Sequence, residues 1–153
     1  MKVKAYKFKK LANLVRAHYN DSGADCYSMI DIEIQPHTVV KIPTGIAVDL
    51  PDGYDICVHC KSGLSSKGLW ASNAPVDAGY KPDITKIDEN GYLLEDAGAE
   101  VHAIICNVTD NPIKVNMGEK IGQFVMRPIV YADFVFGDLG QERKSGAFGS
   151  TGK

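Results

Sequence analysis

The stretch from Lys61 to Gly68 gathers groups that can bind an anion. Two lysines, three serine hydroxyls and two glycines fall within these eight residues. If the stretch opens a short helix, the amides of Ser62 and Gly63 lie free at its positive end, where phosphate groups bind. The spacing is not that of a P-loop, and a serine-rich turn with a helix cap explains the same residues without a ligand.

Two aspartates beside turn residues, and one glutamine, could act on a phosphate ester. Asp77 stands three residues before Tyr80, so a carboxylate that can orient a water precedes a ring that can meet a sugar or base. Asp25 follows the turn at Ser22-Gly23 and could hold a hydrated Mg²⁺ that rests mainly on substrate phosphates. Gln123 could donate a hydrogen bond from its side-chain amide N–H to a phosphate. An ordinary turn or surface role remains open for each of the three.

The last eleven residues, Arg143 to Lys153, suit a nucleotide better than a protein core. One aromatic ring, Phe148, stands among glycines and hydroxyls and could stack on a base. Donors for phosphates come from one guanidinium and from hydroxyls and amides near the end: Arg143, Gly149, Ser150 and Thr151. A mobile chain end explains the same composition, because ordering so many glycines costs much backbone entropy.

The cysteines, histidines and single tryptophan give less support to chemistry. Cys57-x-x-Cys60 lacks the second ligand pair of a zinc site, and an alternating run around it predicts a strand. Buried, reduced cysteines are therefore expected. The four histidines show no metal or triad spacing, so they are interpreted as ordinary surface or core residues, and Trp70 as a packing residue.

Short alternating segments separated by turn residues predict an all-β protein, a sandwich, barrel or jelly roll. Strands are predicted at 2–9, 24–28, 30–34, 39–42, 46–50, 54–60, 101–106, 113–115, 121–126 and 129–135. A phase slip at Ala5-Tyr6 predicts a bulge in the first strand, whose lysines favour a sheet edge. Only 11–18, as a helix or a loop, and 62–68 are helix candidates. One domain at 1–137 and a flexible C-terminal lid at 138–153 are expected.

The composition limits which kinds of binding partner are expected. The chain has 153 residues, 44% of them hydrophobic and 24% charged, which is ordinary for one globular domain. A net charge of -2 gives no argument for binding a nucleic-acid polymer. No apolar run approaches the roughly 20 residues of a membrane span, and no export signal is recognisable, so a cytoplasmic location is expected.

Taken in order, these segments resemble the trimeric dUTP pyrophosphatase (dUTPase) family, which has five ordered motifs. Ser22-Gly23-Ala24-Asp25 resembles A-G-x-D, and Lys61-Ser62-Gly63 with Lys67 and Gly68 resembles R-S-G-x-x-x-K-x-G. Val76 to Tyr80 resembles I-D-x-x-Y, Gly118 to Gln123 resembles G-x-[RK]-I-A-Q, and Arg143 to Gly152 resembles R-x-x-G-G-F-G-S-T-G. The resemblance implies a jelly-roll-like fold with a short helix, a homotrimer, and hydrolysis of dUTP to dUMP and pyrophosphate with Mg²⁺.

The resemblance also implies a site shared by three chains. The first, second and fourth motifs would come from one chain, the third from a second and the tail from the third. Asp77 would orient the attacking water and Tyr80 would stack on the deoxyribose. The turn that contains Asn73, Val76 and Tyr80 would recognise uracil, and the phosphates would bind to Lys61, Ser62, Gly63 and Gln123. Asp25 would bind Mg²⁺ through water. The tail would close over the nucleotide through Arg143, Phe148, Gly149, Ser150 and Thr151.

Several positions depart from the family pattern. Lys61 stands where arginine is usual, Gly79 where an acidic residue is common, Gly122 where alanine is usual and Ala147 where glycine is usual. Residues 84–100 form an acidic insertion, expected to be a hairpin or arm near the active-site mouth. It could contact a regulatory protein or be an inert loop. A dCTP deaminase relative, a non-enzymatic dUTP sensor and a structural subunit remain alternatives. Limiting uracil in DNA and supplying dUMP for dTMP synthesis would be the role of the enzyme.

Overall fold

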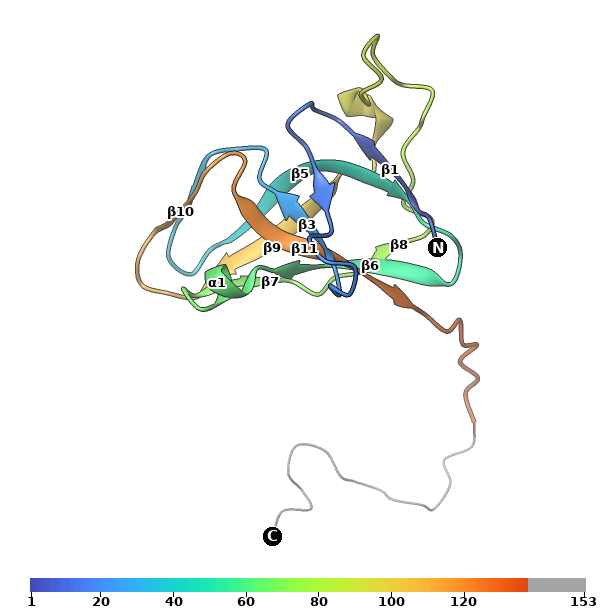
Figure 1. Cartoon of the computed structure of the whole chain (residues 1–153). Coiled ribbons are helices and arrows are strands. Elements are labelled where there is room, and N and C mark those ends of the chain that lie inside the picture. The colour runs from blue at the N-terminus through green and yellow to red at the C-terminus, as the bar shows by residue number, and fades with distance from the viewer. Residues whose placement is uncertain (138–153) are drawn as a thin grey trace.

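Residues 1–137 are described by the structure, a computed structural model, and they form an almost entirely β-stranded domain (Figure 1). The strands are β1 (Lys4–Lys7), β2 (Leu14–Val15), β3 (Ala24–Tyr27), β4 (Ile32–Ile34), β5 (Val39–Asp49), β6 (Tyr54–Cys60), β7 (Leu69–Ala71), β8 (Val76–Asp77), β9 (Val101–Asn107), β10 (Ile113–Val115) and β11 (Lys120–Pro128). The short helix α1 (Ser62–Ser65) and the 3-10 turn η1 (Glu95–Ala97) complete the list. The predicted all-β, jelly-roll-like class is confirmed. Within this part of the chain, no helix has the length and apolarity to cross a membrane.

All strand pairs are antiparallel. Sheets form in the orders β1-β5-β9-β7 and β2-β3-β11-β6-β8, and a small third sheet pairs β10 with β4. The two larger sheets enclose one core, in which Ile42 and Ile105 of the first sheet belong to the same cluster as Ile56 and Phe124 of the second. Burying each such side chain stabilises the fold by roughly 1.5–3 kcal/mol. The core therefore fixes the two sheets that carry the site.

The strand β5 corrects one prediction. Two strands with a turn at Pro43-Thr44-Gly45 were expected, but β5 runs through eleven residues with only a register shift against β9. The Thr44 hydroxyl donates to the Val101 carbonyl at 2.6 Å. Gly45 has a φ of +69°, and a Cβ there would lie 2.7 Å from the Cβ of Ala12. Pro43, Thr44 and Gly45 therefore make a bulge inside one strand, because the core holds both halves of β5.

Four smaller predictions also need correction. β1 is an edge strand as expected, but its unbroken register with β5 has no bulge at Ala5-Tyr6. Residues 11–18 contain β2 and no helix. β11 ends at Pro128, which has no N–H to continue the ladder, and 129–135 form no strand. Trp70 is 62% exposed, so it does not pack in the core.

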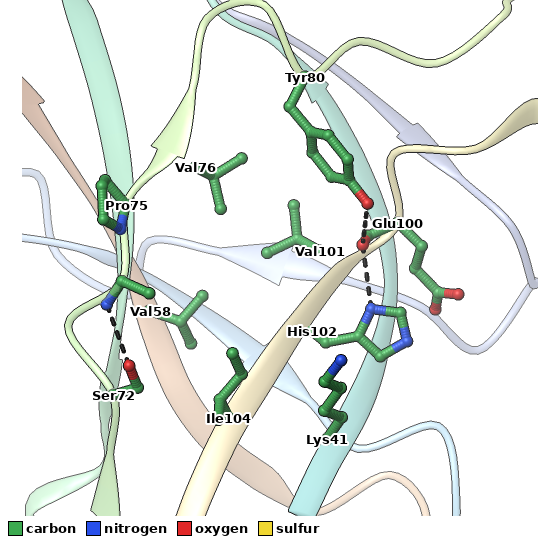
Figure 2. A pocket seen from close by; sticks show the side chains of 11 residues that line it. Lys41, Val58, Ser72, Pro75, Val76, Tyr80, Glu100, Val101, His102 and Ile104 are labelled. Carbon is green, nitrogen blue, oxygen red and sulfur yellow. Dashed lines mark hydrogen bonds between the residues drawn. The ribbon is translucent and has the colours of Figure 1, made fainter.

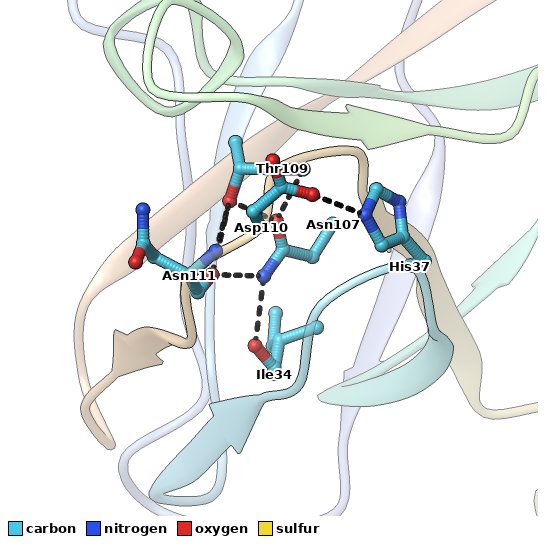
Figure 3. Close-up of polar contacts among 6 residues, drawn as sticks. All are labelled: Ile34, His37, Asn107, Thr109, Asp110 and Asn111. Carbon is cyan, nitrogen blue, oxygen red and sulfur yellow. Dashed lines mark hydrogen bonds and ion pairs between the residues drawn. The ribbon is translucent and has the colours of Figure 1, made fainter.

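A buried polar network ties the third sheet to β9 (Figure 3). The Asn107 amide nitrogen donates to the carbonyls of Ile34 at 2.9 Å and Asn111 at 2.8 Å. Its side-chain oxygen accepts from the amide and hydroxyl of Thr109 at 3.0 and 2.8 Å. Asn107 is fully buried, so these bonds offset the cost of burying its polar groups.

The 84–100 insertion projects from the body as an arm (Figure 1). Ile87 and Leu93 form an isolated antiparallel bridge within it. Leu93 is buried and belongs to a small cluster with Ala47, against which Tyr6 packs. Its N–H donates to the Lys7 carbonyl at 2.8 Å. The arm is thus anchored near the edge strand β1 through Leu93 and Ala97, and its exposed acidic side chains include those of Glu89, Glu95 and Asp96.

Candidate active site

Asp25 and Gln123 meet at one end of the five-stranded sheet. They face each other across β3 and β11, and Gln123 Nε2 donates to Asp25 Oδ1 at 3.2 Å. Lys120 Nζ lies 2.6 Å from Asp25 Oδ2, while the Asp25 side chain is 7% exposed. This hydrogen bond raises the pKa of Lys120, so the ammonium stays charged and balances the buried carboxylate. The first and fourth motifs therefore form one polar unit.

The second motif joins the same end of the sheet. The Lys61 N–H donates to the Ile121 carbonyl at 3.1 Å, directly after β6 ends, and α1 begins at Ser62. The amides of Leu64 and Ser65 both donate to the Lys61 carbonyl. Within residues 1–137, the amides of Ser62 and Gly63 have no main-chain acceptor. This is expected, because the first amides of a helix have no partner within the helix. Space around Gly63 is open, since a Cβ would meet only Lys61 Cε at 3.9 Å.

Asp77 lies at the opposite end of β6. β8 pairs with β6 through Val76 opposite Ile56 and Asp77 opposite Asp55. Asp55 is buried and receives two hydrogen bonds from Arg127, at 2.9 and 2.7 Å. Asp77 is exposed, so it is the carboxylate of this pair that a solute can reach.

The predicted site residues consequently fall into two separate groups. Asp55, which lies opposite Asp77, precedes Lys61 by six residue steps along β6. At about 3.3 Å per residue, this separation is about 20 Å. Within one chain, Asp77 and the Lys61–Gly63 stretch cannot touch the same phosphate.

A cavity of about 210 Å³ opens beside the Asp77 group (Figure 2). Val76 and Tyr80, both predicted, line it together with Lys41, Glu100 and His102, which sequence reasoning missed. The Glu100 carbonyl accepts from the Tyr80 hydroxyl at 3.5 Å and lies 3.0 Å from His102 Nδ1. No spacing in the sequence connects these residues. Only the pairing of β5 with β9, and the return of the chain through the arm, brings them together.

One edge of β9 is open at this cavity. β7 follows β9 until Ser72, whose N–H donates to the Ile104 carbonyl at 2.8 Å, and the chain then crosses to β6 at Val76. Alternate residues of an antiparallel strand direct their main-chain groups to the same edge. The N–H and C=O of His102 therefore face the gap, and Pro43 stands opposite on the other edge, where no N–H is needed. The gap offers a donor and an acceptor side by side.

Within residues 1–137, no group of three or more histidine, cysteine, aspartate or glutamate side chains that could hold a metal ion is found. The four cysteines are free, two of them buried and two half-buried, so burial is confirmed in part. Cys57 and Cys60 lie in β6, which confirms the predicted strand. Arg143, Phe148, Gly149, Ser150 and Thr151, the predicted lid residues, lie outside the described residues.

Comparison with known proteins gives consistent findings. A model of the dUTPase family matches residues 10–152. The chain is 34% identical to a deoxyuridine 5'-triphosphate nucleotidohydrolase of Gloeothece citriformis, covering 99% of this chain and 97% of that protein. It is 38% identical to one of Thermobifida fusca, over 89% of this chain and 70% of that protein. A Staphylococcus bacteriophage 80alpha dUTPase structure with dUPNHPP, described as controlling transfer of virulence genes, matches with a TM-score of 0.75, 23% identity and 99% coverage of both chains.

Proposed function

Because the chain belongs to the dUTPase family and is a dUTP diphosphatase, we propose that Asp77 directs water onto the α-phosphorus of dUTP. The oxygen of this water bonds to the α-phosphorus while the bond to the oxygen bridging the α- and β-phosphorus breaks. The products are dUMP and pyrophosphate. Asp77 orients the water and accepts its proton, which then passes to solvent. The observation that carries this proposal is the exposed position of Asp77, which directly follows Val76 of the cavity lining in the chain.

The cavity beside Asp77 is the place for deoxyuridine. Uracil presents an acceptor, a donor and an acceptor along one edge, which the open N–H and C=O of His102 can meet. Ala74, Pro75 and Val76 form the facing wall. Tyr80 stacks on the deoxyribose and leaves no room for a 2′-hydroxyl, which would exclude UTP. The mixed apolar and polar lining supports a base and sugar rather than a phosphate.

The phosphates belong to the other end of β6. Lys61, the amides of Ser62 and Gly63, and the Gln123 side chain hold the α- and β-phosphates there. Asp25 suits a Mg²⁺ ion held mainly by the substrate, because a hydrated ion needs one carboxylate beside it and not a protein cage. When bound, Mg²⁺ neutralises phosphate charge. Gln123 and Lys120 hold the two Asp25 carboxylate oxygens, at 3.2 and 2.6 Å, so Asp25 would hold the ion through its waters.

The proposed site takes residues from more than one chain. The separation of about 20 Å along β6 supports a site in which Asp77 of one chain lies beside the phosphate-binding residues of another, as in a homotrimer. Three apolar side chains after β11 are also exposed, which supports their burial in an interface: Val130 is 91% exposed, Phe134 93% and Phe136 104%. The tail, with Arg143 and Phe148, closes over the nucleotide from a third chain and excludes water.

We also propose a cellular role and a protein partner. The enzyme works in the cytoplasm, limits uracil incorporation into DNA and supplies dUMP for dTMP synthesis. A regulatory protein binds the arm at 84–100, which stands clear of the body and carries exposed acidic side chains. The phage dUTPase with a control function supports the idea that this fold can serve regulation.

One assay tests the chemistry directly. The purified protein with Mg²⁺ receives dUTP, dCTP, dTTP or UTP, and pyrophosphate and ammonia are measured. We expect pyrophosphate from dUTP alone, and none after EDTA addition. Ammonia from dCTP would favour the deaminase alternative, and dUTP binding without pyrophosphate release would favour a sensor.

A further inference from the structure

Cys57 carries a buried thiol that the proposed chemistry does not use. It lies in β6 opposite Val125 of β11 and is fully buried. Its Sγ donates to the Asn73 carbonyl at 3.3 Å, an ordinary distance for a sulfur donor. Burial raises the pKa of the Cys57 thiol. At neutral pH it is therefore protonated and can act as a hydrogen-bond donor.

The accepting residue begins a short crossover between the two large sheets. Ser72 still bonds to β9, and Val76 already pairs with β6. Between them, the Ala74 N–H donates to the Ser72 hydroxyl at 3.2 Å, which is a bond inside the segment. In residues 1–137, the Cys57 thiol makes the hydrogen bond that ties 73–75 to the rest of the domain.

The crossover is also a wall of the cavity. Ala74 and Pro75 line it, facing His102 on the open edge of β9. The width of the gap depends on where the crossover lies, since β9 is fixed by β5 on its other edge. A tether at Asn73 therefore sets how much room a base has.

We propose that Cys57 is a positioning residue whose thiol sets the width of the base-binding cavity through the Asn73 carbonyl. The assignment of the cavity to uracil rests on the proposed function. Loss of the donor loosens the crossover, weakens nucleotide binding and admits the larger thymine base. Turnover of bound dUTP is unaffected, because the pairing of β8 with β6 holds Asp77 independently.

Three substitutions test the donor. Cys57→Val fills the space without a donor, Cys57→Ala leaves a small void, and Cys57→Ser keeps a donor. For Val and Ala we expect KM for dUTP to rise about fivefold, as loss of one weak hydrogen bond predicts. Their kcat should stay within about twofold, and their preference for dUTP over dTTP should fall. Cys57→Ser should behave like the unchanged protein. Failure of the serine to rescue, or a loss in kcat instead of KM, would overturn the proposal.

Two further variants separate this proposal from the proposed function. Cys106→Ala, on β9 and outside the cavity lining, controls for loss of a cysteine and should change nothing. Tyr80→Ala should raise KM. If it does not, the cavity is not the deoxyuridine site, whatever Cys57 does. Hydrogen exchange at the Ala74 amide measures how firmly the crossover is held and does not depend on turnover. The exchange rate should increase in Cys57→Val but not in Cys57→Ser. Equal rates in the two variants would also overturn the proposal.

Discussion

Asp77 lies directly opposite Asp55 in the pair of β8 and β6, six strand residues away from Lys61. Asp55 is neutralised by the two hydrogen bonds from Arg127. Asp77 has no such partner among the described residues and stands at the surface. One chain thus separates the residue suited to activate water from the residues suited to hold phosphates.

Replacing Asp77 by asparagine should abolish turnover while leaving dUTP bound. General base catalysis contributes about 10²–10⁴-fold to a rate, so kcat should fall by about that factor. Affinity measured by calorimetry should stay within a few-fold, since the amide keeps the shape of the side chain. Asp52→Asn, in the exposed turn after β5, is the matched control. Full activity of Asp77→Asn would exclude the role in orienting water.

Mixing two inactive variants should restore activity. Asp77→Asn and Lys61→Glu should each inactivate every active site of a trimer made of that variant alone. In a mixed trimer, one site of three combines an intact Asp77 with an intact Lys61 from the neighbouring chain. Equal amounts, unfolded and refolded together, should recover about one quarter of normal activity for random cyclic trimers. A mixture that stays inactive after refolding, while unchanged protein recovers, would mean that each chain completes its own site.

Introducing alanine at Gly122 should destabilise this protein, although alanine is usual there in the resembling family. An added Cβ would lie 2.4 Å from the His59 carbonyl oxygen, a main-chain atom of β6. Such overpacking costs about 1–3 kcal/mol, and a shift of β6 would also move Lys61. Denaturant unfolding measures the change. Gly79→Ala, where the space is open, should stay within about 0.5 kcal/mol. Equal stability of the two variants would contradict the close approach.

Stability should fall above pH 9 because of Cys26. Burial, assisted by the charge of Asp25, raises the pKa of this thiol from 9.0 to about 12. Between these values the unfolded chain loses the proton and the folded chain keeps it. The contribution is therefore complete below pH 9 and declines by about 1.4 kcal/mol per pH unit above it. Urea unfolding at about pH 8, 9 and 10 should give a steeper decline for the unchanged protein than for Cys26→Ala. Parallel curves would contradict the prediction.

Deleting residues 143–153 should cut turnover without disturbing assembly. The proposed lid supplies Arg143 and Phe148 only when the substrate is bound, so kcat should fall by at least about 10²-fold, the order expected for lost electrostatic stabilisation. Size-exclusion chromatography with light scattering should report the same trimer. Dissociation into smaller species would assign the tail a structural part.

Much of the fold could be predicted from residue patterns. Alternation in segments such as 54–60 and 101–106 marks strands, because a pleated strand turns every second side chain to the core. The same local reasoning failed at Pro43-Thr44-Gly45, where turn residues lie inside the continuous strand β5. It also failed for 129–135, which has a strand-like composition but no pairing partner in residues 1–137. Turn propensity and alternation are local, whereas pairing depends on which segments the core brings together.

For the site, the sequence by itself determined which residues are the candidates: Asp77, Tyr80, Lys61-Ser62-Gly63 and Gln123 are recognisable by type and order. The tertiary structure decided their arrangement. It joined Gln123 to Asp25 across two strands, placed His102 on an open edge of β9, and set Asp77 far from Lys61. These relationships arise from strand register and from the crossover at 73–75, which are properties of paired segments and not of any one segment. A list of residues therefore names the groups that can react, and the sheet decides which of them one chain can use together.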